Sequence, residues 1–228
     1  MWKYQLPEIE EAWMGYKLNS KIKVISFEGL PGTGKKILAE HLSINLGGSL
    51  NWIDYPQNSF LSDYYLVDEL NGLAMEVSLL LQRRDILKKV LQPGIFSPGP
   101  FITDANLHRG RIYASCTLNA EEYHLFLEIS SLVLDQLPQP DLLVYLREDL
   151  QVVKSKIAKS EYKPERDMDR EYLENLSQAM DDYLLNLPLD NMLIVNGYDS
   201  SSEVITSGVI QEIVNFNEGI RYYNIGKG

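Results

Sequence analysis

Residues 22–42 read IKVISFEGLPGTGKKILAEHL, and this stretch decides the fold. The β-branched and apolar residues of 22–27 predict a buried strand. A glycine-rich turn follows it, and the apolar residues after Lys35 recur at helical spacing. Glycines let the backbone fold around an anion, whose charge is then met by successive N–H groups and a helix N-terminus. The stretch therefore predicts a phosphate-binding P-loop between a strand and a helix.

The loop supplies most of the contacts that a nucleotide requires. Lys35 is expected to reach the terminal phosphates of ATP. Lys36 stands where this motif usually has Ser or Thr, whose hydroxyl binds Mg²⁺. An ammonium group repels a metal ion, so Mg²⁺ binding must depend on other residues. A glycine turn that binds no anion is the alternative, but the complete strand–loop–helix context argues against it. The expected nucleotide contacts in the loop are Gly29, Gly32, Thr33, Gly34, Lys35 and Lys36.

The composition excludes several classes of function. The 228 residues include 21 Lys and Arg against 32 Asp and Glu, for a net charge of -11. This balance argues against broad binding of nucleic acid polymers, which requires a basic face. The single cysteine excludes an intramolecular disulfide framework and suits a reducing compartment. No apolar run has the length of a membrane span, and no signal or transit peptide is evident. We expect a cytoplasmic location and leave a mitochondrial one open.

Strand-like apolar runs alternate with helical patterns along the chain. The predicted strands cover residues 22–27, 50–53, 100–103, 142–146 and 192–195. The alternation predicts an α/β fold: a parallel five-stranded sheet with helices on both faces. We expect an N-terminal arm over 1–20, a P-loop domain over 21–217 and a C-terminal tail over 218–228. Within the domain, a charged segment at about 159–168 predicts a helical lid, with a solvated helix end as the alternative.

Candidate catalytic residues follow the strands, because ligands of parallel sheets bind outside the carboxyl ends of the strands. Asp54 follows the second predicted strand and Asp104 the third. One carboxylate is suited to accept the proton of an acceptor hydroxyl, and the other to organise Mg²⁺. Each is alternatively a helix cap or turn residue. We predict catalytic roles for Asp54, Lys35 and Asp104, and metal contacts from Glu28 and Asp104.

Six segments together form a recognisable pattern: ISFEGLPGTGKKILAEHL, NSFLSDYY (58–65), LAMEVSLLLQR (73–83), TD (103–104), RIYA (111–114) and LLVYL (142–146). Their order over residues 21–187 resembles the deoxynucleoside kinase family. The resemblance implies transfer of the γ-phosphate of ATP to the 5′-hydroxyl of a deoxynucleoside, in a homodimer.

The same resemblance implies roles for individual residues. Asp54 is the nearest candidate for the general base of the family. Tyr65 and Glu165 are expected to contact the sugar, and Glu76 the base. Lid cations, among them Lys156 and Arg166, are expected to close over the phosphates. The expected substrate contacts are Tyr65, Glu76, Arg83, Asp104, Arg109 and Glu165.

Three departures from the family pattern affect the predicted function. Lys36 replaces the metal-binding hydroxyl. Glu76 replaces a glutamine, and a carboxylate donates no hydrogen bond unless it is protonated. It therefore favours a base edge that presents donors, as guanine does, and disfavours thymine. Ala105 replaces an arginine, which leaves Arg109 or Arg111 to supply that charge.

Two alternatives to a purine deoxynucleoside kinase stay open. The first is a kinase-fold protein that binds nucleotide or a protein partner without turnover, as does a kinase-like accessory subunit of respiratory complex I. Lys36, Glu76 and Ala105 favour this alternative. The second is a nucleoside monophosphate kinase such as thymidylate kinase, which has a similar opening. The aromatic pair before residue 66 and the helix that contains Glu76 favour a nucleoside acceptor instead.

Overall fold

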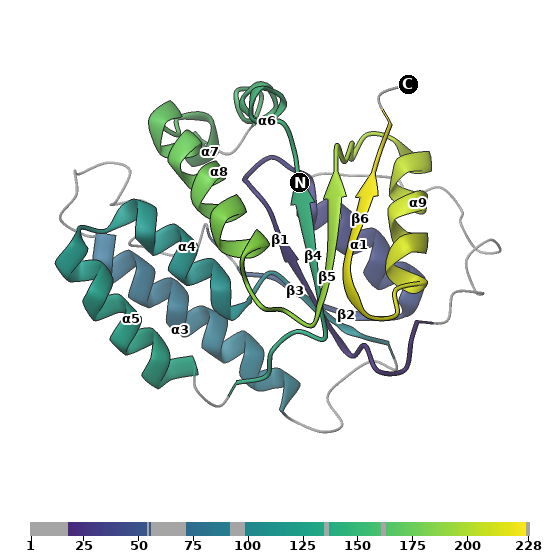
Figure 1. Ribbon diagram of the computed structural model, residues 1–228, viewed down its shortest axis with the longest axis horizontal. Helices are drawn as coiled ribbons and strands as arrows, with labels where there is room; N and C mark the ends of the chain where they lie inside the picture. Colours follow the sequence, from purple (N-terminus) through teal and green to yellow (C-terminus); the bar gives the residue numbers. More distant parts are fainter. Residues whose placement is uncertain are drawn as a thin grey trace.

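The computed structural model describes residues 18–53, 55, 72–91, 99–134, 137–160 and 163–226. These residues form one parallel sheet of six strands in the order β2-β3-β1-β4-β5-β6, with helices on both faces (Figure 1). The predicted α/β class and the five predicted strands are confirmed, with small shifts at their ends. The strands are β1 (Val24–Glu28), β2 (Ser49–Asn51), β3 (Phe101–Thr103), β4 (Leu142–Arg147), β5 (Asn191–Asn196) and β6 (Gly219–Asn224).

The sixth strand is a difference from the prediction, which gave five strands and placed residues 218–228 in a tail. β6 pairs in parallel with β5, with Asn191 opposite Gly219 and Asn196 opposite Asn224. Most of its residues are exposed. An edge strand of a parallel sheet need not carry the continuous apolar run that marks a buried strand. The sequence GIRYYN therefore gave no strand signal, and the predicted sheet was one strand short.

The helices form a layer on each face of the sheet and a group above its carboxyl-terminal edge (Figure 1). One face is covered by α1 (Lys35–Leu46) and α9 (Glu203–Val214). The helices on the other side are α3 (Gly72–Val90), α4 (Leu107–Thr117), α5 (Ala120–Leu134) and α8 (Arg170–Leu185). Near the carboxyl ends of the strands lie α6 (Leu150–Ile157) and α7 (Lys163–Arg166).

The central strands are buried on both faces, as parallel strands covered by two helical layers must be. All five residues of β1 are buried, and Ile25 and Phe27 have no exposed surface. Phe27 packs in the cluster beneath α1 and α9, whereas Tyr145 of β4 packs in the cluster beneath α8. This burial fixes β1 between β3 and β4, so that Glu28 and the loop after it open at the carboxyl-terminal edge of the sheet. In the described part of the chain, no helix is long and apolar enough to cross a membrane.

Candidate active site

The glycine loop after β1 has the backbone that the sequence predicted. Gly29, Gly32 and Gly34 all have positive φ angles, of 145°, 74° and 83°. A Cβ at Gly29 would lie 2.6 Å from the carbonyl oxygen of Leu146, and one at Gly34 would lie 2.8 Å from Cβ of Ser200. Positive φ and close backbone approach both require glycine. The loop is thus wedged between the end of β4 and the segment that follows β5.

Lys35 is the first residue of α1, and its side chain folds back over the loop. Its Nζ donates to the carbonyl oxygen of Leu30 at 2.5 Å and lies 3.3 Å from Oγ1 of Thr33. Burial lowers the pKa of Lys35 to about 7, and the positive charge of Arg109 adds to this effect. Lys36, the next residue, is exposed. A phosphate group would supply the negative charge that the Lys35 ammonium lacks here.

Glu28, at the end of β1, is the centre of a buried ionic cluster. Its Oε1 accepts from Nη1 of Arg109 at 2.7 Å and from the N–H of Gly29 at 3.1 Å. Its Oε2 accepts from Nδ2 of Asn106 at 2.9 Å. Burial opposes the charge on Arg109, but Glu28 raises the pKa of Arg109 well above its usual value. The ion pair and the Asn106 bond hold the start of α4 against the phosphate loop.

Asp104 lies next to this cluster at the end of β3. Its Oδ1 accepts from the N–H of Ile53 at 2.9 Å, and its Oδ2 accepts from the hydroxyl of Tyr55 at 3.1 Å. Burial raises the pKa of Asp104, although Arg109 and both hydrogen bonds oppose the shift. Asp104 thus binds the residues on either side of Asp54 in the sequence. Asp54 itself lies outside the described residues, and so does Tyr65.

A second buried polar group lies on α3. Glu76 and Arg83 are each about 1% exposed. Within the described ranges, Oε2 of Glu76 and both Nε and Nη1 of Arg83 have no hydrogen-bond partner. A Cβ at Gly110 of α4 would lie 3.0 Å from Nη1 of Arg83. The guanidinium therefore packs directly against the backbone of α4.

The predicted lid residues have different surroundings. Nζ of Lys156 on α6 lies 3.3 Å from Oε2 of Glu148 and 3.2 Å from the carbonyl oxygen of Tyr198. Arg166 is exposed and pairs with its neighbour Asp167 at 3.6 Å. Glu165 accepts from the Ser160 hydroxyl at 2.8 Å, and its charge raises the pKa of Lys35, which brings α7 into the electrostatic field of the loop.

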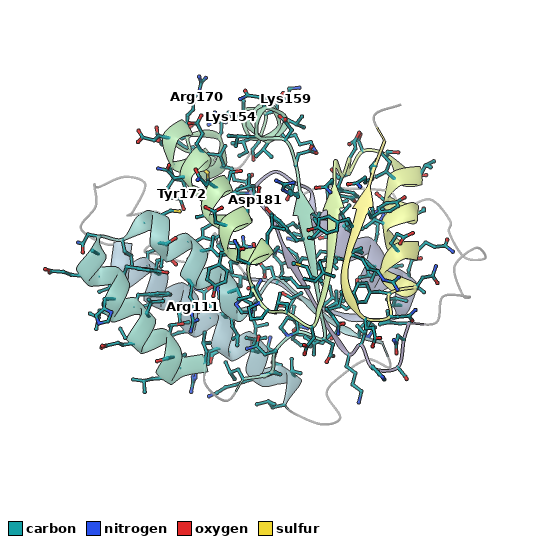
Figure 2. The ribbon with its side chains drawn as sticks, viewed as in Figure 1. Arg111, Lys154, Lys159, Arg170, Tyr172 and Asp181 are labelled. Atoms are coloured by element: carbon teal, nitrogen blue, oxygen red, sulfur yellow. The ribbon has the colours of Figure 1, made fainter. Side chains whose placement is uncertain are left out.

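Other cations of this region gather at one end of the molecule. Figure 2 shows Lys154, Lys159 and Arg170 around α6 and the start of α8. Arg111 lies apart from them on α4 (Figure 2). Lys154 is engaged, because its Nζ pairs with Glu174 of α8. The lid cations therefore differ in their partners. Nζ of Lys156 connects α6 to the segment after β5, because it donates to the carbonyl oxygen of Tyr198.

The structure brings together most of the predicted residues and adds three that sequence reasoning missed. Asn106 caps α4, accepting from the N–H groups of His108 and Arg109. Asparagine before a helical pattern is a cap signal, so this role was open to prediction. Its bond to Glu28 and the contact of Tyr55 with Arg109 join distant segments and leave no local signal, whereas Tyr113 lies four residues after Arg109 on α4, a spacing that the sequence does show. The Arg109 guanidinium lies 4.8 Å from the ring centroid of Tyr113 and 5.8 Å from that of Tyr55.

Few side-chain oxygens around the loop are available as ligands for Mg²⁺. Lys36 offers no oxygen, and the oxygens of Glu28 already accept from three donors. Asp104 keeps lone pairs free, since each oxygen accepts one bond. Among the described residues, no group of three or more His, Cys, Asp and Glu side chains is placed to hold a metal. The residues fit an ion held by Asp104 and by substrate phosphates rather than by a protein cage.

Comparisons with known proteins place the chain in a family. A family model described as deoxynucleoside kinase matches residues 25–217. Deoxyguanosine kinase of Bacillus subtilis (strain 168) is 26% identical over 152 residues, covering 67% of this chain and 73% of the relative. Deoxyadenosine/deoxycytidine kinase of the same organism is 21% identical over 201 residues, covering 81% of this chain and 91% of the relative.

Solved structures support the fold. Deoxyadenosine kinase from M. mycoides with bound dATP superimposes with a TM-score of 0.69 at 18% identity, over 84% of this chain and 98% of the other. Thymidylate kinase from Candida albicans gives a TM-score of 0.59 at 21% identity, over 85% and 92% of the two chains. Because the family match spans most of the sequence, the chain belongs to the deoxynucleoside kinase family, whose members are phosphotransferases that act on nucleosides.

Proposed function

We propose that this protein transfers the γ-phosphate of ATP to the 5′-hydroxyl of a purine deoxynucleoside. The observation that carries the proposal is the convergence of Lys35, Glu28, Arg109 and Asp104 at the carboxyl-terminal edge of the sheet, beside the glycine loop. Phosphoryl transfer requires mainly positioning and charge neutralisation. A phosphate cradle, fixed cations and a carboxylate within one cluster meet those requirements.

The glycine loop and Lys35 are assigned to the phosphates of ATP. A glycine loop that runs into a helix N-terminus offers backbone N–H groups to an anion, and this loop runs directly into α1. Lys35 would exchange the Leu30 carbonyl for phosphate oxygens, a stronger charge-assisted contact. We assign Lys156 to the same nucleotide, because it lies against the segment after β5 that borders the loop. Arg166 is exposed, so we propose that it contacts the phosphates only when the lid is closed.

Arg109, rather than Arg111, is assigned the charge that Ala105 does not supply. Arg109 is buried beside Glu28, and its field reaches both Lys35 and Asp104. Its Nε has no partner within the described ranges, so one donor is available to a substrate oxygen. Arg111 is only half-buried and acts electrostatically on His108, on the side of α4 that faces α8. A fixed cation near the transferred group stabilises the charge that develops there.

Asp54 is proposed as the general base for the 5′-hydroxyl. Its neighbours Ile53 and Tyr55 are tied to Asp104, which gives the segment a defined anchor. Asp104 rather than Glu28 is proposed as the protein contact of Mg²⁺, because Glu28 accepts from three donors, one of them the charged Arg109, whereas each oxygen of Asp104 accepts from one neutral donor. When bound, Mg²⁺ would neutralise charge on the phosphate oxygens. Tyr65 and Glu165 stay assigned to the sugar by resemblance.

Glu76 supports the assignment of a purine substrate. A buried carboxylate accepts two hydrogen bonds, which matches the N1–H and amino donors of guanine. Thymine presents a single N–H between two carbonyl oxygens and fits such an acceptor poorly. Both curated relatives are named as kinases of deoxynucleosides, which favours turnover over the alternative of a silent binding protein. The likeness to thymidylate kinase reflects the shared fold.

ADP release by the purified protein with MgATP and each of the four deoxynucleosides tests the proposal. We expect turnover with deoxyguanosine or deoxyadenosine ahead of thymidine. Asp54→Asn should lower kcat by at least about a hundredfold, while ATP binding is retained. Asp190→Asn, in the turn before β5, is the matched control and should leave kcat unchanged. ATP binding without turnover on any nucleoside would favour the silent alternative, and turnover on dTMP alone would favour a monophosphate kinase.

A further inference from the structure

The phosphate loop has one apolar side chain in the core cluster that α6 and α8 form. Leu30 is only 4% exposed and belongs to the same buried cluster as Ile157 of α6 and Leu173 of α8. These two helices lie on either side of α7 in the chain (Figure 1). The loop that we assign to the phosphates of ATP is therefore also part of the packing that holds the predicted lid.

The end of α6 lies directly against the loop at Gly32. A Cβ at Gly32 would lie 3.2 Å from Cγ1 of Ile157 and 3.6 Å from Cβ of Lys156. The absence of a side chain at Gly32 thus lets the last turn of α6 approach the backbone of the loop. Ile157 is 5% exposed, and protein interiors are close-packed. A displacement of the loop at this point therefore has to displace the end of α6 as well.

The backbone of Leu30 is held by the cation that we assign to phosphate. Its carbonyl oxygen accepts from Nζ of Lys35 at 2.5 Å and from the hydroxyl of Thr33 at 2.8 Å. When Lys35 turns to a phosphate oxygen, the carbonyl group of Leu30 loses its charged donor. Nucleotide binding thus changes the hydrogen bonding of a residue whose side chain lies in the cluster of α6 and α8.

Ile157 is also the residue at which α6 ends and the chain turns toward α7. Its carbonyl oxygen accepts from the N–H of Ser160 at 2.8 Å. The hydroxyl of Ser160 in turn donates to Oε2 of Glu165 at 2.8 Å. A shift of α6 is therefore passed through one hydrogen-bonded turn to Glu165, the carboxylate that the family resemblance assigns to the sugar.

Resting on the proposed nucleoside kinase function, we propose that Leu30 and Ile157 couple the two substrate sites, so that a nucleotide on the phosphate loop tightens the binding of the nucleoside. Both are positioning residues, because they act through Lys35 and Glu165. In the free chain the charge of Glu165 acts on Lys35. Phosphates bring negative charge to Lys35 and offset this attraction, which leaves Glu165 available to the sugar.

Calorimetric titration of the full chain with a purine deoxynucleoside, with and without saturating ADP and Mg²⁺, tests this inference. ADP places phosphates on the loop without turnover, and the nucleoside is whichever of deoxyguanosine and deoxyadenosine binds more tightly. We expect ADP to lower the Kd of the nucleoside by about tenfold, and the nucleoside to lower the Kd of ADP by the same factor, because coupling is reciprocal. Equal Kd values with and without ADP overturn the inference, as does failure of both nucleosides to bind.

Three variants of α6 locate the coupling. Ile157→Ala removes the Cγ1 atom that faces Gly32, so the effect of ADP should disappear while each Kd measured alone changes by no more than about twofold. Ile157→Val retains Cγ1 and should keep the effect. Val153→Ala is the matched control, because it removes apolar atoms from the same buried cluster one helical turn earlier, and it should also keep the effect. Coupling that survives in Ile157→Ala, or that is lost equally in Val153→Ala, overturns the inference.

Leu30→Ala tests the other side of the contact and decides the matter if Ile157→Ala does not fold. It removes the side chain from the cluster and keeps the carbonyl oxygen that accepts from Lys35, so it should also abolish the coupling. ADP release from MgATP with the same nucleoside separates the inference from the proposed function. Coupled binding without ADP release would refute the kinase and leave the inference standing, whereas turnover with uncoupled binding would do the reverse.

Discussion

Among the described residues two arginines are buried, and their electrostatic surroundings differ. Arg109 donates to Glu28 and Tyr113 and lies over two aromatic rings. Arg83 is more deeply buried, yet two of its donor atoms have no partner within the described ranges. The Glu28–Arg109 pair is therefore balanced before any substrate binds, whereas two donor atoms of Arg83, between α3 and α4, have no such partner among the described residues. The Glu28–Arg109 pair is suited to holding groups in position, whereas these two donor atoms of Arg83 can gain hydrogen bonds from a ligand.

The largest expected effect comes from removing Lys35, the cation that we propose binds phosphate. Lys35→Met should lower kcat by about a thousandfold, because no other side chain of the loop is expected to stabilise the negative charge on the transferred phosphoryl group. The melting temperature should stay the same or rise, because a buried ammonium of low pKa is costly to keep. Steady-state kinetics and thermal unfolding measure the two effects. Lys88→Met, on the exposed face of α3, is the control, and an equal loss of kcat there would contradict the assignment.

Arg109→Gln should reduce both catalysis and stability. It leaves Glu28 as an unpaired buried charge, so we expect a loss of about 3 kcal/mol in the free energy of unfolding. We also expect about a hundredfold loss in kcat/KM. The double variant with Glu28→Gln should recover stability but not activity, which separates folding from catalysis. Arg111→Gln should change neither quantity much. An activity loss at Arg111 that exceeds the loss at Arg109 would reverse the assignment of the two arginines.

Arg83→Met should behave in the opposite way in the stability measurement. Two donor atoms of the buried Arg83 guanidinium have no partner within the described ranges. Replacing it by an apolar side chain of similar length should leave the free energy of unfolding unchanged or raise it by about 1 kcal/mol. The KM for the nucleoside should nevertheless rise by at least about tenfold. Urea unfolding and substrate titration check the two halves. A destabilisation as large as that of Arg109→Gln would mean that the surroundings of the two arginines do not differ.

The smallest expected effect is a proton taken up when ATP binds. At about pH 8, Lys35 is largely neutral in the free protein, because its pKa is lowered to about 7. Phosphate oxygens raise that pKa again, so binding should take up as much as about one proton. The uptake should disappear at about pH 6, where Lys35 is already charged. Calorimetry in two buffers of different ionisation enthalpy measures it. Lys35→Arg, which stays charged throughout, should bind without uptake, and continued uptake would point to another group.

The sequence predicted the fold where the pattern was local and strong. The strand, glycine loop and helix of residues 22–42 lie where expected, because each is specified by neighbouring residues. β6 was missed because its burial is low and its pairing partner, β5, is far away in sequence. In the site, Lys35 and Asp104 could be proposed from the sequence by their place after a strand, and their roles stay predictions. The sequence could not favour Arg109 over Arg111, because Glu28, the partner of Arg109, lies in another segment.

The position of β6 has a consequence for any shortened form of the chain. The family match ends at residue 217, just before β6 begins at Gly219. Without β6, the backbone N–H and C=O groups along one side of β5 would lose their partners. The inner residues of β5 are buried and apolar, so the new edge would expose apolar side chains as well as unpaired backbone groups. Such edges recruit strands from other molecules. An exposed, polar strand that contributes little to the core thus protects the protein from self-association.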